Sequence, residues 1–107
     1  MSLHKEIRFE NVIRAHLAAH GCIFSNVESL FPAGLDYPSI TSTEDGNIIL
    51  EWIRPHARIE LEVNITDNKL ELYATNMKAV KFEEKLFTTE QWLDAIGRVS
   101  ELLAPTT

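Results

Sequence analysis

The side chains with the most regular spacing for chemistry are carboxylates at alternate positions. Together with one tyrosine in the same pattern, they are Glu51, Glu60, Glu62, Glu71 and Tyr73. Alternate residues of a strand point to one face of a sheet, so the pattern predicts a single acidic surface. Such a surface can bind a basic partner, or it can simply keep a sheet face solvated. Hard cations need six or more oxygens, which regular strands present too sparsely, so we expect no metal and no cofactor.

A histidine pair is the other candidate for metal chemistry. His16 and His20 lie one helical turn apart, which suits zinc, but Leu17 stands where a metalloprotease has its glutamate. No other Cys or His is spaced to complete a zinc shell, so we expect a packed or half-exposed pair. The sequence also lacks a glycine-rich phosphate loop and a nucleophile elbow. Without an ordered nucleophile, base and orienting group, it favours a protein that is not an enzyme.

The acidic positions belong to a series of predicted strands. From residue 39 the spacing of apolar residues changes from a period of 3.6, typical of helices, to a period of 2, typical of strands. The alternating segments are 48–53, 58–65, 70–74 and 80–82. Turn-forming pairs separate them: Asp45-Gly46, Pro55-His56, Asp67-Asn68 and Asn76-Met77. The pattern predicts an antiparallel meander.

Loop lengths predict the register of this meander. A four-residue loop over 54–57 places Leu50 opposite Leu61. A two-residue turn at 67–68 then places Leu61 opposite Ala74, and a three-residue loop over 76–78 places Ala74 opposite Val80. The apolar residues paired in this way then share one face, and a slip of one residue would reverse a whole strand.

The same register pairs the residues of the acidic face. The predicted pairs are Glu51–Glu60, Glu62–Tyr73, Glu71–Asn64 and Glu71–Glu83. Opposed carboxylates are destabilising by about 0.2–1 kcal/mol per pair. Arg58 and Lys81 offset these charges only in part.

Ile49 and Ile53 point to the acidic side of the predicted sheet. A two-residue turn at Asp45-Gly46 would add Ile40 to them, whereas a three-residue turn with Gly46 left-handed would send Ile40 inward. Either the first helix covers this patch, or the patch is exposed and contacts another chain. The second case predicts a homodimer or partner interface at this end of the sheet.

Two helices flank the strands. Residues 3–20 carry apolar side chains at three-and-four spacing and stop before Gly21, and residues 89–103 do so behind a capping box formed by Thr88 and Gln91. Residues 25–38, with two prolines and a glycine, are the only long loop. The prediction is one α+β domain over 1–107: an antiparallel four- or five-stranded β-meander packed by an N-terminal and a C-terminal helix.

Composition limits the partners and the compartment. The 107 residues carry a net charge of −6, which disfavours nucleic acid as a partner. No apolar run is long enough to span a bilayer, so no membrane association is expected. The single cysteine, Cys22, fits a reducing compartment. These features predict a cytoplasmic protein.

The N-terminus resembles a known family. The matching residues are Met1-Ser2-Leu3-His4-Lys5-Glu6-Ile7, Phe9-Glu10, Ile13 and His16-Leu17-Ala18-Ala19-His20-Gly21. They look like the opening of the R subunits of type I restriction enzymes, and the likeness covers about the first fifth of the chain. In that family this helix opens a nuclease domain with an Asp…Glu-x-Lys metal site. The formal counterpart is Asp67 with Glu83-Glu84-Lys85, whose carboxylates would bind Mg²⁺.

A second likeness covers residues 38–72. Pro38-Ser39-Ile40, Glu44-Asp45-Gly46, Leu50-Glu51-Trp52 and Ile59-Glu60-Leu61-Glu62-Val63 are similar to a pattern in short uncharacterised bacterial proteins. Together the two likenesses imply a bacterial protein with a link to restriction-modification.

The leading hypothesis is a non-catalytic interaction domain that uses the acidic face, with Ile49 and Ile53 beside it, to bind a protein partner or a second copy. One alternative is a restriction-type, metal-dependent nuclease or its remnant. Another is an acidic inhibitor or immunity-type protein that blocks a nucleic-acid-binding site, with an affinity that falls steeply with salt.

Overall fold

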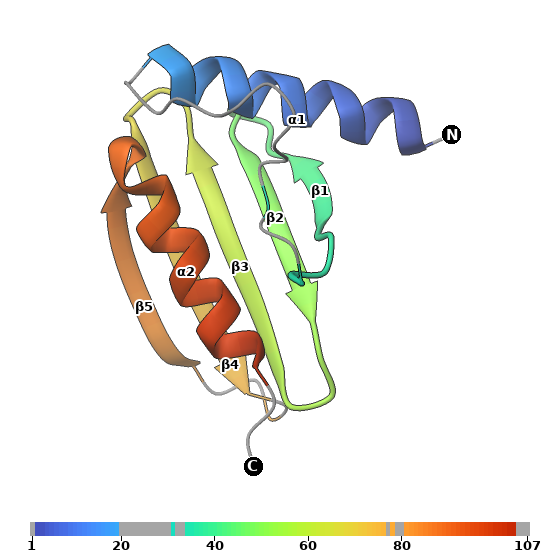
Figure 1. Ribbon diagram of the computed structural model, residues 1–107, viewed down its shortest axis with the longest axis vertical. Helices are drawn as coiled ribbons and strands as arrows, with labels where there is room; N and C mark the ends of the chain where they lie inside the picture. The colour runs from blue at the N-terminus through green and yellow to red at the C-terminus, as the bar shows by residue number, and fades with distance from the viewer. Residues whose placement is uncertain (1, 20–30, 32–33, 77, 79–80, 105–107) are drawn as a thin grey trace.

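Five strands follow one another in the chain and in the sheet, in the order β1-β2-β3-β4-β5, each antiparallel to the next. The computed structural model describes residues 2–19, 31, 34–76, 78 and 81–104, with the side chains of 2–10 and 82 excepted. Its elements are α1 (Ser2–Ala19), β1 (Ser39–Ser42), β2 (Ile48–Ile53), β3 (Ala57–Asn64), β4 (Lys69–Asn76), β5 (Lys81–Thr88), a 3-10 turn (Thr89–Gln91) and α2 (Trp92–Leu103). This is the predicted α+β architecture, with five strands (Figure 1).

The β2–β3 hairpin has the predicted register. Leu50 lies opposite Leu61, with both side chains buried. Backbone hydrogen bonds between Arg54 and Ala57, at 2.8 and 3.3 Å, close the hairpin around Pro55-His56. The proline has no N–H to donate, so a turn is where it costs the sheet least.

The β1–β2 hairpin takes the second of the two predicted forms. The Thr43 N–H donates to the Asn47 carbonyl at 2.9 Å, which leaves a three-residue turn ending at Gly46. Gly46 has φ +87°, a left-handed conformation that glycine adopts without strain. As a result Ile40 pairs with Leu50 and is buried in the core.

The predicted β3–β4 register was wrong by two residues. Val63, not Ile65, lies opposite Leu70, so four residues form the turn. The backbone N–H of Ile65 is withdrawn from the ladder because it donates to the Asn47 side chain at 3.2 Å. Asn64 accepts from the Asp67 N–H at 2.9 Å, which stabilises the longer turn. An even shift keeps every side chain on its predicted face.

The predicted β4–β5 register was also wrong, and here a bulge is the cause. The ladder shifts between Ala74 and Thr75, whose partners are Glu83 and Lys81. The extra residue reverses the facing of the rest of β5. Glu83 therefore faces α2 instead of the acidic surface, and Leu86 takes the place opposite Glu71. The predicted position of Val80 lies outside the described residues.

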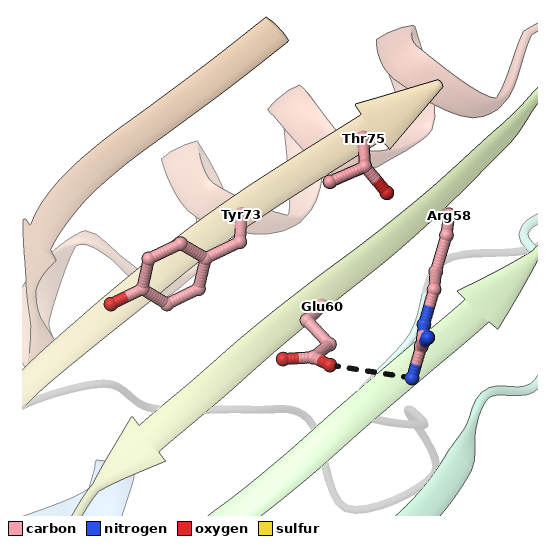
Figure 2. Close-up of a pocket in the computed structure, with 4 residues that line it drawn as sticks. All are labelled: Arg58, Glu60, Tyr73 and Thr75. Carbon is pink, nitrogen blue, oxygen red and sulfur yellow. Dashed lines mark ion pairs between the residues drawn. The ribbon is translucent and has the colours of Figure 1, made fainter. Parts of the chain in front are cut away.

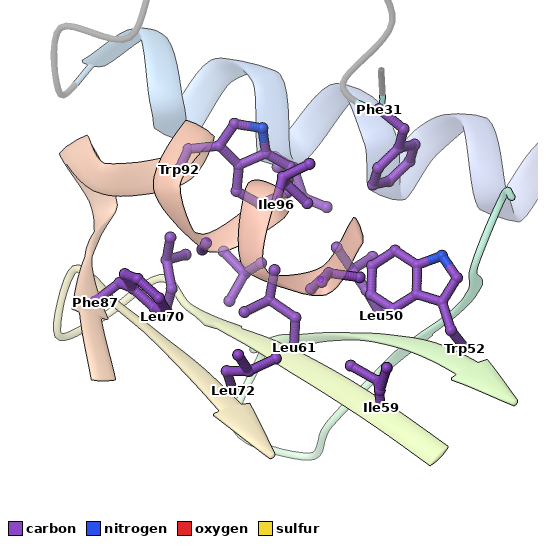
Figure 3. Packing of buried hydrophobic residues seen from close by; sticks show 14 of the residues in the cluster. Phe31, Leu50, Trp52, Ile59, Leu61, Leu70, Leu72, Phe87, Trp92 and Ile96 are labelled. Carbon is purple, nitrogen blue, oxygen red and sulfur yellow. The ribbon is translucent and has the colours of Figure 1, made fainter. Parts of the chain in front are cut away.

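Both helices pack on one face of the sheet, with the core between them and the strands (Figure 3). α1 contributes Ile13 and Leu17, which are buried. α2 contributes Trp92, Ala95, Ile96, Val99 and Leu103. The predicted capping box is present, since the Thr88 N–H donates to Gln91 Oε1 at 2.9 Å. We call the covered side of the sheet its inner face and the opposite side its outer face.

An ion pair fastens α2 to the edge of the sheet. Arg98 on α2 donates to Glu83 on β5 from two nitrogens, one of them Nε at 2.7 Å from Oε2. Hydrogen bonding from Arg98 lowers the pKa of the Glu83 carboxyl. A carboxylate held in this two-point geometry fixes orientation as well as charge.

The described part of the predicted 25–38 loop also packs against the core. The Phe31 ring lies edge-on to Trp52, with centroids 6.2 Å apart, and is buried. The indole N–H of Trp52 donates to the Asp36 carbonyl at 2.8 Å, and Arg54 pairs with the Asp36 carboxylate at 2.6 Å. Residues 25–30, 32 and 33 of this loop, like His20, Gly21 and Cys22, lie outside the described residues.

Candidate functional site

The outer face carries all five residues of the predicted acidic surface, arranged in cross-strand rows. One row, from β1 to β5, is Thr41, Ile49, Glu62, Glu71 and Leu86; the next is Ser39, Glu51, Glu60, Tyr73 and Glu84. The strand register brings these side chains together, because directly opposed Cβ atoms lie about 4.5–5.5 Å apart. We call the surface formed by Glu51, Glu60, Glu62, Glu71, Tyr73 and Glu84 the acidic face.

The acidic face has different neighbours from those predicted. Glu51 does lie opposite Glu60. Glu62 lies opposite Glu71, however, and Tyr73 lies between Glu60 and Glu84. The two-residue shift between β3 and β4 and the bulge in β5 produce these changes. Carboxylates are directly opposed at Glu51–Glu60 and at Glu62–Glu71. The predicted pairs were Glu51–Glu60 and Glu71–Glu83.

Cations offset one end of the acidic face. Arg58 pairs with Glu51 and lies 3.7 Å from a Glu60 carboxylate oxygen. Lys81 pairs with Glu84 at 2.7 Å. These two residues are the ones predicted to offset the charge in part.

Glu62 and Glu71 have no ion-pair partner within the described part of the chain. Glu62 accepts a hydrogen bond from the Asn47 side chain at 3.2 Å, and Glu71 accepts one from the Tyr73 hydroxyl at 2.5 Å. Both donors are neutral, so the two opposed charges stay uncompensated. The pair therefore concentrates negative charge at one point of the outer face.

Asn47 is a residue of this surface that the sequence reasoning missed. It is only 7% exposed, and its side chain both donates to Glu62 and accepts from the Ile65 N–H. A buried amide with both ends satisfied holds the β1–β2 hairpin against β3. The only signal in the sequence is its position directly after the turn glycine.

Tyr73 lies at the centre of the acidic face, between two shallow hollows. One, of about 220 Å³, is lined by Arg58, Glu60, Tyr73 and Thr75. Figure 2 shows these four side chains on the side of the sheet away from α2. The other, of about 450 Å³, is lined by Glu71, Tyr73, Glu84, Lys85 and Leu86. The hydrogen bond to Glu71, burial and the nearby carboxylates raise the pKa of Tyr73 to about 12.

Apolar side chains flank the carboxylates. On β2, Ile49 is half-buried and Ile53 is 66% exposed, and on β5 Leu86 is 61% exposed. Of the two alternatives for these isoleucines, the exposure of Ile53 favours the exposed patch over cover by the first helix. The buried described residues of α1, Ile13 and Leu17, belong to the core on the inner face. Leu86 was missed because the bulge that turns it outward has no local signature in the sequence.

The residues of the nuclease-like pattern are not brought together. Asp67 lies in the β3–β4 turn, where it bonds to Asn64. Glu83 pairs with Ala74, five residues further along β4 than Lys69, where the turn ends. At ~3.4 Å per residue this separates the two backbone positions by roughly 17 Å along the strand. The two carboxylates cannot bind one ion, whose ligands lie within about 2.6 Å of it.

His16 makes a structural contact. Its Nε2 lies 3.3 Å from the Thr89 hydroxyl, which joins α1 to the turn before α2. Within the described residues, no three His, Cys, Asp or Glu side chains gather in a way that could hold a metal ion. None of the helices in the described ranges is long and apolar enough to cross a bilayer.

Comparison with protein-family models, curated proteins and solved structures found no match to this chain. The acidic face is therefore interpreted from its own geometry.

Proposed function

We propose that this chain is a protein-interaction domain whose acidic face binds a basic segment of a partner protein. The observation that carries the proposal is the Glu62–Glu71 pair, two opposed carboxylates that no cation of the described residues pairs with, on the sheet face away from α2. Such a pair is destabilising by about 0.2–1 kcal/mol in the free protein. A partner's arginine or lysine placed between the two would turn this repulsion into attraction.

The surroundings of the pair support a protein as the partner. Ile49 and Leu86 flank the pair in the same row, so the carboxylates lie between two apolar contacts. Interfaces between proteins combine apolar anchors and aromatic side chains with charged groups in this way. Tyr73 supplies a rigid aromatic anchor beside the pair. Nucleic acid is disfavoured because its phosphates would meet the same carboxylates.

The proposal is tested with a hexa-arginine peptide as a probe, by calorimetry and by amide chemical shifts of the labelled protein. Glu62→Gln/Glu71→Gln removes two charges from the acidic face. We expect it to weaken binding about tenfold or more, which corresponds to ~1.4 kcal/mol. Shift changes should centre on β3 and β4, and added salt should weaken binding further.

A charge-matched control separates the site from net charge. Glu44→Gln/Asp45→Asn also removes two charges, from exposed positions in the β1–β2 turn. This variant should bind nearly as well as the parent protein. Equal weakening by the two variants would mean that the peptide responds only to overall charge, and the proposal would fail.

A further inference from the structure

The sheet edge farthest from β1 borders a groove. Between the edge strand β5 and α2 lies a hollow of about 520 Å³, whose lining includes Leu86, Leu93 and Gly97. Leu86 is 61% exposed and Leu93 is 75% exposed. Among the described strands β5 pairs only with β4, so its other edge presents backbone N–H and C=O groups. Apolar side chains and an open edge thus meet in one place.

Packing among the described residues gives no reason for a glycine at position 97. Glycine is less favourable than alanine in a helix interior. A Cβ at Gly97 would meet nothing within 4 Å, and its φ does not lie in the left-handed region. Neither backbone nor packing therefore requires glycine here. A glycine at this position would let another chain approach the helix surface closely.

We propose that a second copy of this chain closes the groove, by antiparallel pairing of β5 with β5 around Leu86. A twofold axis normal to the sheet keeps the inner faces on one side, and it must lie midway between the two copies of one β5 residue, which then face each other. An axis at Glu83, Glu84 or Lys85 would oppose like charges. An axis at Leu86 opposes leucine with leucine and Lys85 with Phe87.

The shape of β5 agrees with this register. The bulge lies beside Lys81 and Glu83, at the start of the strand. Because bulges disrupt edge pairing, the first half of β5 is protected from pairing with another strand. Residues 84–88 pair regularly with β4 and form the half that the Leu86-centred register uses. Lys85 already lies over its own Phe87 ring, at 5.3 Å, so the same two residue types suit contact across the axis.

The helices are self-complementary in the same arrangement. Leu93 and Gly97 lie one helical turn apart on the groove side of α2. Antiparallel helices related by the twofold would place Leu93 of each copy over Gly97 of the other. The ionic groups of the groove are balanced, with Lys85 and Arg98 against Asp94 and Glu101. A second copy is therefore not repelled here, as it would be at the acidic face.

Sedimentation equilibrium of the whole chain tests the dimer. We expect a dimer that Leu93→Glu and Leu86→Glu each weaken about tenfold or more in Kd, ~1.4 kcal/mol. Both positions are exposed, so both variants should fold. Ile53→Glu, an equally exposed position on the outer face of β2, is the matched control and should leave Kd unchanged. Gly97→Ala should raise the thermal midpoint of the dilute monomer and weaken the dimer.

Cross-linking tests the register. In a Cys22→Ser background, Leu86→Cys should form an intermolecular disulfide on mild oxidation, because residue 86 faces itself across the axis. Ile53→Cys in the same background should not. A chain that sediments as a monomer up to about 1 mM, or a dimer disrupted by Ile53→Glu and not by Leu93→Glu, would overturn the proposal. Because these readouts need no basic peptide, they are independent of the acidic-face proposal.

Discussion

Truncating Leu61 to alanine is expected to lower the free energy of unfolding by about 2–5 kcal/mol, the range for a buried leucine. Leu61 is 0% exposed at the middle of β3, between Leu50 on β2 and Leu72 on β4. Alanine would lose the transfer free energy of the removed atoms. It would also leave a cavity that three hydrogen-bonded strands can close only in part. Urea unfolding at neutral pH measures the loss.

The adjacent residue provides the control for Leu61→Ala. Glu60 points to the outer face, and its described ionic contact is the 3.7 Å approach of Arg58. Glu60→Ala should change the free energy of unfolding by no more than about 0.5 kcal/mol. A register slipped by one residue would exchange the two results. Similar losses at both positions would contradict the alternation of β3.

Replacing Trp92 with alanine should lower the free energy of unfolding by about 3–5 kcal/mol. Trp92 is 0% exposed and is the first residue of α2. Its ring centroid lies 6.3 Å from that of Phe31. One indole therefore packs both α2 and the described part of the 25–38 loop onto the sheet. Removing it deletes contacts to two segments at once. The measurement is urea unfolding with the amide spectrum as a check that the variant is folded.

Leu93→Ala is the matched control for Trp92→Ala. It truncates a large apolar residue one position further along α2, on the exposed side of the helix. At a concentration where the chain is monomeric, the change should stay within about 0.5 kcal/mol. If Trp92→Ala cost no more than Leu93→Ala, the orientation of α2 would have to be different.

The first two hairpins could be predicted because turn chemistry and alternation agree in them. Pro55-His56 and Asp45-Gly46 mark turns whose lengths leave few registers. Burial of one face selects among those few. Ile40 shows the limit of this reasoning: two turn lengths were open for it. The left-handed Gly46 and the hydrogen bond between Thr43 and Asn47 select one of them.

The register of the later strands depends on contacts that are distant in sequence. Asn47 takes the N–H of Ile65, which lengthens the β3–β4 turn, and no local pattern around residue 65 reveals this. The bulge that turns Glu83 toward Arg98 is stabilised by a helix that follows it in the chain. Five residues of the acidic face could be predicted because the even shift between β3 and β4 preserves facing. Glu84 was missed, because the bulge turns it outward in place of Glu83. The pairing within the acidic face, and the outward position of Leu86, could not be predicted.

Carboxylates from three strands surround Tyr73 on the sheet face away from α2, and the titration of this phenol tests that arrangement most directly. A Tyr37→Phe background leaves Tyr73 as the only tyrosine. Its phenolate absorbance should report a pKa of about 12. Because the folded state raises this pKa, the neutral phenol is the favoured form. The protonated Tyr73 phenol therefore contributes fully to the stability of the fold below the pKa of the unfolded state, ~10. This contribution is lost as the pH rises through the pKa of the folded state.

At about pH 11 a phenol with an ordinary pKa of ~10 is mostly ionised, so that pH separates the outcomes. We expect Tyr73 to remain mostly protonated there, and Glu71→Gln to lower its pKa by removing the carboxylate that accepts its hydrogen bond. A Tyr73 that titrates near pH 10 in the folded parent protein, unchanged by Glu71→Gln, would contradict the acidic face and the interaction proposed for it.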